Sequence, residues 1–120
     1  MDDQAYFSWA DDYFSVDILL DGNVDAGDME AGDSIITLST GERYSALLLT
    51  TEELSRIMNR HEHSGESLGG RYFCAPDLIV VREKGVMSMV DVIRDIVHSE
   101  DVPALLPRIG EDGRPILPEM

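Results

Sequence analysis

The sequence predicts an α+β fold in which an antiparallel sheet carries two amphipathic helices packed on one face. Residues 34–49 form two apolar runs around a short turn with Gly41, which is typical of a β-hairpin. Residues 51–63 and 85–101 instead repeat apolar side chains at helical spacing. The resulting order of strand, hairpin, helix, strand and helix indicates segregated rather than alternating elements.

The strands follow from composition and turn signals. Residues 13–22 are rich in aromatic and β-branched side chains and stop at an Asp-Gly pair, which predicts a strand. The hairpin of residues 34–49 turns at residues 39–42. Residues 71–83 contain one or two further strands, and Pro76 is expected at a strand end or in a bend because it donates no ladder hydrogen bond.

The first helix is predicted for residues 51–63. Thr50 and Glu53 form a capping box at its start, and the Gly-rich segment SGESLGG ends it. The second helix lies within GVMSMVDVIRDIVHSED, where the apolar positions from Val86 to Val97 fall on one face.

The 120 residues are expected to form a single domain, with residues 103–120 as a Pro-rich tail. This tail could cover the core through Leu105, Leu106 and Ile109, or fray beyond Gly110. No apolar run is long enough for a membrane span, and the acidic N-terminus lacks the features of a secretory signal. With Cys74 as its single cysteine, the chain is expected to be soluble and cytoplasmic.

The charge of the chain is strongly negative and unevenly distributed. There are 24 Asp and Glu against nine Lys and Arg, which gives a formal net charge of −15. Residues 1–42 contain eleven of these acids and no Lys or Arg, so that segment alone carries −11. Such a surface repels nucleic acids and anionic membranes. It indicates either an acidic face for a basic partner or a surface that serves solubility alone.

The acidic segment DGNVDAGDMEAGDS, residues 21–34, begins like a calcium loop. Asp21, Asn23 and Asp25 match the first three ligand positions of an EF-hand. Ala26 then stands where the pattern requires Gly, and Gly32 stands where the closing Glu belongs. The segment is therefore interpreted as a loop between two strands, and as a candidate contact surface rather than a metal site.

Three other motifs point weakly to chemistry. GESLG, residues 65–69, matches the nucleophile elbow of α/β-hydrolases, but a helix is expected before it and a strand after it, the reverse of that motif. His61 and His63 are two residues apart, which is unsuitable for two ligands on one helix face. Cys74 is expected to be a small buried hydrophobic residue rather than a nucleophile. No catalytic residue, metal or cofactor is predicted.

The N-terminal segment AYFSWADDYF combines five aromatic residues with two acids. This mixture is common in protein interfaces. It fits equally an N-terminal helix or arm that packs its aromatic side chains on the core.

Several stretches give the chain a family resemblance. ITLSTGERYSALLLTTEELSRIM, GESLGGRYFCAPDLIVV and VMSMVDVIRDIV, within residues 13–99, resemble bacterial immunity proteins of contact-dependent growth inhibition and other polymorphic toxin systems. The resemblance implies a small acidic cytosolic protein that binds and neutralises one cognate toxin. These families differ in fold and binding surface, so no binding residue carries over from them.

A nuclease toxin is the expected target, because its substrate groove would be basic and would attract concentrated carboxylates. The residues predicted to contact it are Asp11, Asp12, Asp21, Asp25, Asp28, Glu30 and Asp33. Two alternatives remain open. One is a metal-binding enzyme or regulator that uses His61, His63 and Glu66, and the other is an assembly subunit in which the aromatic segment pairs copies of the chain.

Overall fold

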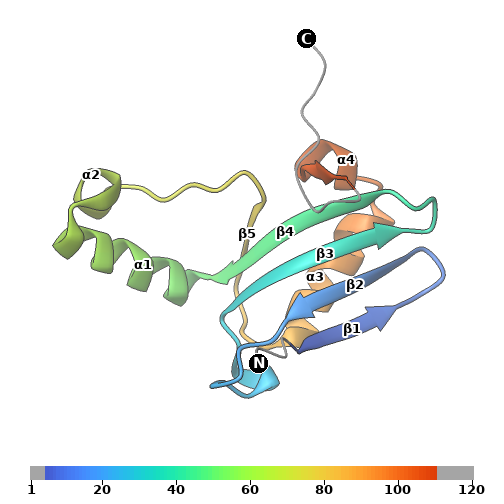
Figure 1. Cartoon of the computed structure of the whole chain (residues 1–120), viewed down its shortest axis with the longest axis horizontal. Coiled ribbons are helices and arrows are strands. Elements are labelled where there is room, and N and C mark those ends of the chain that lie inside the picture. The colour runs from blue at the N-terminus through green and yellow to red at the C-terminus, as the bar shows by residue number, and fades with distance from the viewer. Residues whose placement is uncertain (1–4, 111–120) are drawn as a thin grey trace, which may run out of the picture.

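The fold is organised around an antiparallel meander of four strands, seen in a computed structural model that describes residues 5–110. The strands are β1 (Tyr6–Ala10), β2 (Phe14–Leu19), β3 (Ala31–Leu38) and β4 (Arg43–Thr50). Along the other edge of β4, β5 (Leu78–Val81) pairs in parallel and β6 (Arg108–Ile109) pairs antiparallel (Figure 1). The predicted α+β class and the hairpin of residues 34–49 are confirmed.

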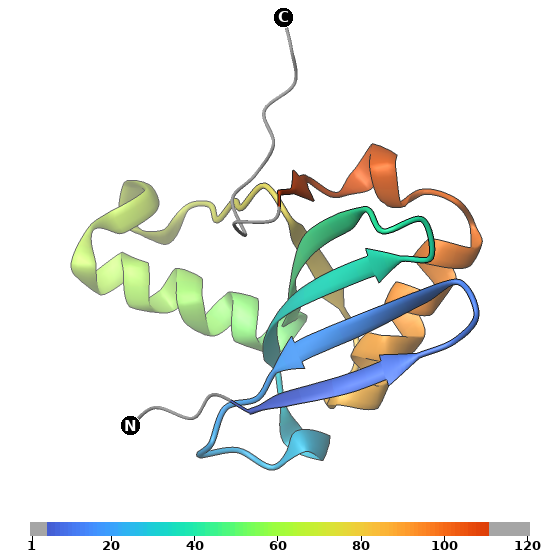
Figure 2. The same cartoon turned by 45° about the vertical axis from the view of Figure 1, so that its right-hand side comes forward.

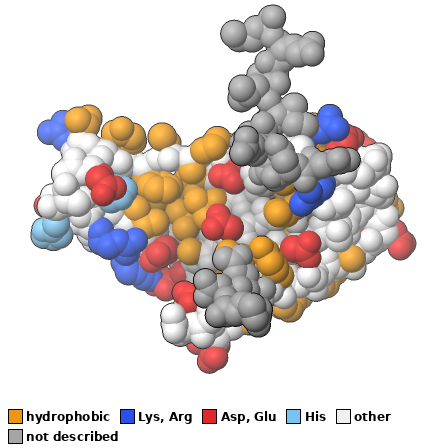
Figure 3. Space-filling view, in the orientation of Figure 1, with side chains coloured by type: hydrophobic (Ala, Val, Ile, Leu, Met, Phe, Trp, Pro, Cys, Tyr) orange, Lys and Arg blue, Asp and Glu red, His pale blue; other side chains and the backbone are white. Residues whose placement is uncertain are grey.

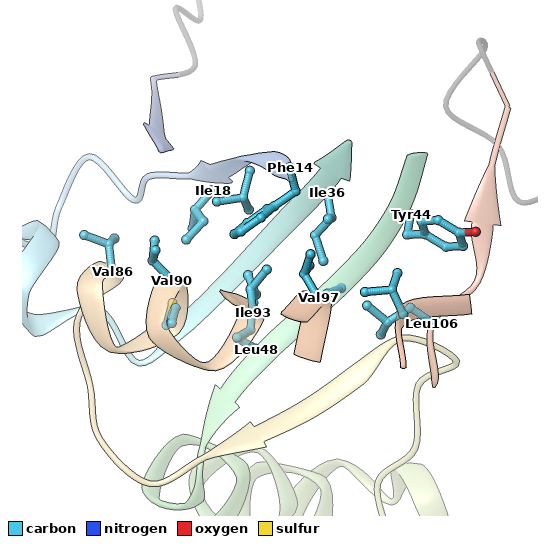
Figure 4. Close-up of a cluster of buried hydrophobic side chains, with 14 of the residues drawn as sticks. Phe14, Ile18, Ile36, Tyr44, Leu48, Val86, Val90, Ile93, Val97 and Leu106 are labelled. Atoms are coloured by element: carbon cyan, nitrogen blue, oxygen red, sulfur yellow. The ribbon is translucent and has the colours of Figure 1, made fainter. Parts of the chain in front are cut away.

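One face of this sheet is covered by α3 (Val86–His98). Side chains of a strand alternate between its two faces. In β2 the residues Phe14, Val16 and Ile18 are buried, with half-buried residues between them. They meet buried residues of α3 such as Val90 and Ile93 in the main core (Figure 4). The second predicted helix therefore does cover the sheet.

The first predicted helix behaves differently. α1 (Thr51–Ser64) begins directly after β4, with the hydroxyl of Thr50 accepting a hydrogen bond from the amide of Glu53 at 3.0 Å. It ends at Gly65, which adopts the left-handed conformation that favours glycine. However, α1 buries no side chain completely and projects from the end of β4 (Figures 1 and 2). The two helices thus do not share one layer.

A tight left-handed turn, α2 (Glu66–Gly70), follows α1. Ser67, Leu68 and Gly69 all have positive φ and ψ, a conformation that costs energy for residues with a side chain. A Cβ on Gly70 would collide with the carbonyl oxygen of Met58. The Gly-rich segment therefore does more than end a helix, because it folds the chain back onto α1.

The C-terminal part of the described chain is packed on the core. Val102 of α4 (Val102–Leu105), Ile109 of β6 and Leu106 between these elements are buried, whereas Leu105 is 58% exposed. Of the two predictions for the Pro-rich tail, residues 103–110 follow the one in which it covers the core. The remainder of that tail lies outside the described residues.

Three local predictions are wrong. The aromatic N-terminal segment is not a helix but strand β1 with its turn to β2, although Phe7, Trp9 and Phe14 do pack on or in the core. Residues 31–34 belong to β3 rather than to the acidic loop, because Gly32 and Ser34 alternate inward with Ile36. Cys74 is exposed, since it lies in the irregular segment between α2 and β5 and not in a strand.

Candidate protein-binding surface

The sheet face opposite α3 carries polar and apolar side chains that alternate with the core residues. We call it the open face. In β3 the inward residues Gly32 and Ser34 are buried, while Asp33 between them is exposed. The neighbouring outward residues on β2 and β4 include Asp17 and Leu47, each half-buried. Figure 3 views this face and shows acidic side chains at the border of a hydrophobic area.

Three carboxylates gather on the open face. Asp17, Asp33 and Asp77 line a shallow cavity of about 180 Å³ together with Tyr6 and Ile35. The hydroxyl of Ser8 donates a hydrogen bond to Asp17 across the β1–β2 ladder. Within residues 5–110, no ion pair involves any of the three carboxylates. Their charge is therefore not neutralised by a described basic side chain.

Hydrophobic side chains lie beside these acids, between α1 and the sheet. Leu54, Ile57 and Met58 of α1 are half-buried and recur at i, i+3 and i+4, so they share one helix face. Leu47, Leu78 and Val80 are outward residues of β4 and β5, and Leu47 pairs with Leu78 in the ladder. We call these six residues the arm surface. Figure 3 shows a hydrophobic area between α1 and the sheet.

The seven acids predicted to bind a partner do not form one surface. Asp11 and Asp12 occupy the turn between β1 and β2, whereas Asp21, Asp25, Asp28 and Glu30 belong to the loop between β2 and β3. These connections lie at opposite ends of β2, which are roughly 17 Å apart for a six-residue strand. Asp33 lies on the open face between them.

The loop acids are largely engaged within the chain. Asp28 forms an ion pair with Lys84 at 3.0 Å, and Glu30 accepts hydrogen bonds from Arg56 and Thr50. The hydrogen bond from Arg56 lowers the pKa of Glu30, and the hydrogen bond to Asp28 raises the pKa of Lys84. Residues 1–42 contain no Lys or Arg, but Lys84 and Arg56 from distant parts of the chain pair with two of the four loop acids.

The two other loop acids have separate positions. Asp21 accepts a hydrogen bond from the amide of Asn23 at 2.9 Å, as in a local turn. Asp25 precedes the short 3-10 turn η1 (Ala26–Asp28) and makes no capping hydrogen bond. Within the part of the chain that the structure describes, no group of three or more His, Cys, Asp or Glu side chains is placed to hold a metal ion.

Asp11 stabilises the turn between β1 and β2, at the end of β2 away from the acidic loop. Its carboxylate accepts hydrogen bonds from the amides of Tyr13 and Phe14, at 2.7 and 3.1 Å, and contacts Nε2 of His98 at 2.8 Å. Burial acts to raise the pKa of Asp11, but the hydrogen bonds from Tyr13, His98 and Phe14 together lower it below its ordinary value. Asp11 thus fastens the first hairpin to the end of α3.

Because the pKa of Asp11 is lowered by folding, this contact stabilises the protein above its unfolded pKa of 3.8 and is lost as the pH falls through the folded value. We expect Asp11→Asn to show a smaller fall in melting temperature than the wild type between about pH 5 and about pH 2. Thermal unfolding followed by circular dichroism measures this. Asp12→Asn is the matched control, since Asp12 is an exposed neighbour of the same charge. An equal acid sensitivity of Asp11→Asn and wild type would contradict the assignment.

The histidines and the GESLG segment were also candidates for chemistry. Nε2 of His61 lies 3.2 Å from a carboxylate oxygen of Glu66, so two of the three residues of the metal-binding alternative do come together. His63 is exposed and belongs to no ion pair among residues 5–110. GESLG connects a helix to a later strand, as its sequence context predicted.

Sequence reasoning missed Asp17, Asp77 and the arm surface. Asp17 carried a usable signal, because it occupies an outward position in an alternating strand. Asp77 precedes β5 in an irregular segment and gave none. The arm surface depends on where α1 projects, which its hydrophobic periodicity does not specify.

Comparison with known proteins adds no assignment to this geometry. Neither a protein-family model, nor a curated protein, nor a solved structure matches the chain. No helix among residues 5–110 is long and apolar enough to cross a membrane.

Proposed function

We propose that this chain is an immunity protein that binds and neutralises a cognate toxin with a basic surface, such as a nuclease. The observation that carries the proposal is the group of Asp17, Asp33 and Asp77 on the open face, which no described basic residue pairs. The net charge of −15 and the family resemblance support it.

Charge of this kind acts mainly on association. A carboxylate-rich face raises the rate at which a basic partner arrives and orients, and the effect weakens with ionic strength. Rapid association suits an inhibitor that must occupy the active groove of a toxin before its substrate does. The acids that are engaged in ion pairs, Asp28 and Glu30, contribute less to this field than acids without such a partner.

The proposal is tested first by co-expression. The gene next to the one that encodes this chain should encode a protein that is toxic when expressed alone and harmless when expressed together with this chain. The two purified proteins should also form a complex. A neighbouring product that is neither toxic nor bound by this chain would refute the proposal.

A charge-matched pair of variants locates the acids that matter. We expect the triple change Asp17→Asn, Asp33→Asn and Asp77→Asn to slow association with the toxin about tenfold at low salt and to reduce its salt dependence. Stopped-flow mixing over a series of salt concentrations measures both effects.

The control for this variant also removes three charges, but from elsewhere. Asp91, Asp95 and Glu100 are exposed on α3 or just after it, and α3 covers the opposite side of the sheet. Replacing Asp91 and Asp95 with Asn and Glu100 with Gln should preserve most of the association rate. Equal slowing by both triple variants would show that net charge acts without regard to the open face.

A further inference from the structure

We infer that the arm surface, with Asp33 and Asp77 at its border, is the docking site for a segment of a protein partner that presents apolar side chains next to Lys or Arg. This inference rests on the proposed function and adds to it the place of contact and the chemistry of the segment that binds there.

The arm surface exposes apolar side chains to solvent. α1 presents Leu54, Ile57 and Met58 on one face without burying any of them completely. On the adjoining strand, Val80 is 46% exposed. Contiguous apolar surface of this kind is unfavourable in water and marks contact sites in soluble proteins. Figure 3 shows it open to solvent between α1 and the sheet.

The arm surface is also held in place. α1 starts directly after Thr50, the last residue of β4, with no intervening loop, and its far end is tied back by α2, where Gly70 lies directly against the backbone of Met58. His61 on the same helix face packs against Phe73, with ring centroids 6.4 Å apart. A surface that is organised before binding loses less conformational entropy when a partner arrives.

The border of the arm surface is negatively charged. Asp33 is the ladder partner of Leu47, and Asp77 lines the same shallow cavity as Asp33, so carboxylates adjoin the apolar residues. Cross-strand partners on one face have Cβ atoms about 5 Å apart. A partner that covers Leu47 therefore brings its own side chains close to Asp33. An apolar segment flanked by Lys or Arg satisfies both parts of this surface.

The same charge pattern argues against a second copy of this chain as the occupant. A symmetric contact through the arm surface would place Asp33 and Asp77 near their own copies. Like charges brought together in this way are destabilising, and each copy also carries the net charge of −15. The partner is therefore expected to be a different, basic protein.

The test uses the full chain and defined peptide probes. The first probe is a short amphipathic helical peptide of Leu and Lys, and the second has Glu in place of each Lys. We expect the Leu–Lys peptide to shift backbone amide signals of residues 47, 54–58 and 78–80 in nitrogen–proton correlation spectra. The Leu–Glu peptide should leave these signals in place. Shifts confined to residues 21–30, or equal shifts with both peptides, would overturn the inference.

Two variants that add the same charge at different places test where the peptide binds. Val80→Lys should weaken binding of the Leu–Lys peptide about tenfold or more, because it removes an apolar contact and adds a repelling charge. Leu105→Lys adds the same charge in place of another exposed aliphatic side chain, on α4 near the other end of the sheet, and should change binding less than about twofold. Equal weakening by the two variants would contradict the inference. Thermal unfolding of both variants establishes that they are folded.

Two further outcomes separate this inference from the proposed function. If the peptide maps to the arm surface but no toxin is neutralised, the docking site stands and the immunity function fails. If a toxin is neutralised equally well by the Val80→Lys variant and the wild type, the function stands and the docking site fails. A dimer in light scattering that Val80→Lys dissociates would also overturn the inference, because the occupant would then be a second copy.

Discussion

Replacing Ile93 with Ala is expected to lower the free energy of unfolding by about 3–4 kcal/mol. Ile93 is fully buried on α3, between that helix and the sheet residues Ile36 and Leu48 (Figure 4). The truncation removes three carbons from a packed interior and leaves a cavity that the surrounding side chains fill only in part. The free energy of unfolding of a small domain is about 5–15 kcal/mol, so this change removes a large fraction of it.

Urea denaturation at neutral pH measures this loss. Met87→Ala is the matched control, because Met87 is on the same helix but 48% exposed, and it should change the free energy of unfolding by less than about 0.5 kcal/mol. A loss below about 1 kcal/mol for Ile93→Ala would mean that α3 is not packed on the sheet as described.

Replacing Gly70 with Ala is expected to release α2 from α1, at a cost of about 2–4 kcal/mol to the local stability of that segment. Two effects combine. The φ of +84° at Gly70 is unfavourable for any residue with a Cβ. The new Cβ would also overlap the carbonyl oxygen of Met58 and lie 3.0 Å from the amide nitrogen of Glu62, and neither backbone atom can move away without distorting α1.

Amide hydrogen exchange of residues 51–70 measures this change locally, which matters because α1 buries no side chain completely and can open without unfolding the core. Gly69→Ala separates the two effects. Gly69 has a similar φ of +69° but nothing within 4 Å of its Cβ position, so its replacement should cost only about 1 kcal/mol. Equal protection in the two variants would exclude the clash with Met58 as the cause.

The sequence predicted best those elements whose hydrophobic side chains pack in the core. β2, β3 and β4 each have one face in the core, and their apolar composition together with the turn signals beside them predicted them. The apolar stripe of α3 is buried as expected. The start of α1 was also recoverable, because the Thr50 cap depends only on neighbouring residues. Its packing was not, because an amphipathic pattern shows that a helix has an apolar side without showing what covers it.

The candidate site was harder to predict for two physical reasons. The ion pairs Asp28–Lys84 and Glu30–Arg56 join residues far apart in the chain, so a local count of charges did not show that two of the four loop acids have basic partners. Asp33 was predicted to contact a partner as part of a loop, and its place in the β3 alternation puts it on the open face instead. Asp77 joins it there because β5 pairs in parallel with β4, a crossover pairing that short sequence patterns do not encode.

The pairing of β4 also bears on how the protein avoids aggregation. β4 is an eight-residue, strongly apolar strand, and an unprotected edge on such a strand would recruit other chains. Here β3 covers one edge, while β5 and β6 divide the other between them. The outermost strands, β1 and β5, are only five and four residues long. The two-residue strand β6 thus covers part of the β4 edge. Among residues 5–110, the strand edges that the sheet presents to other chains are short.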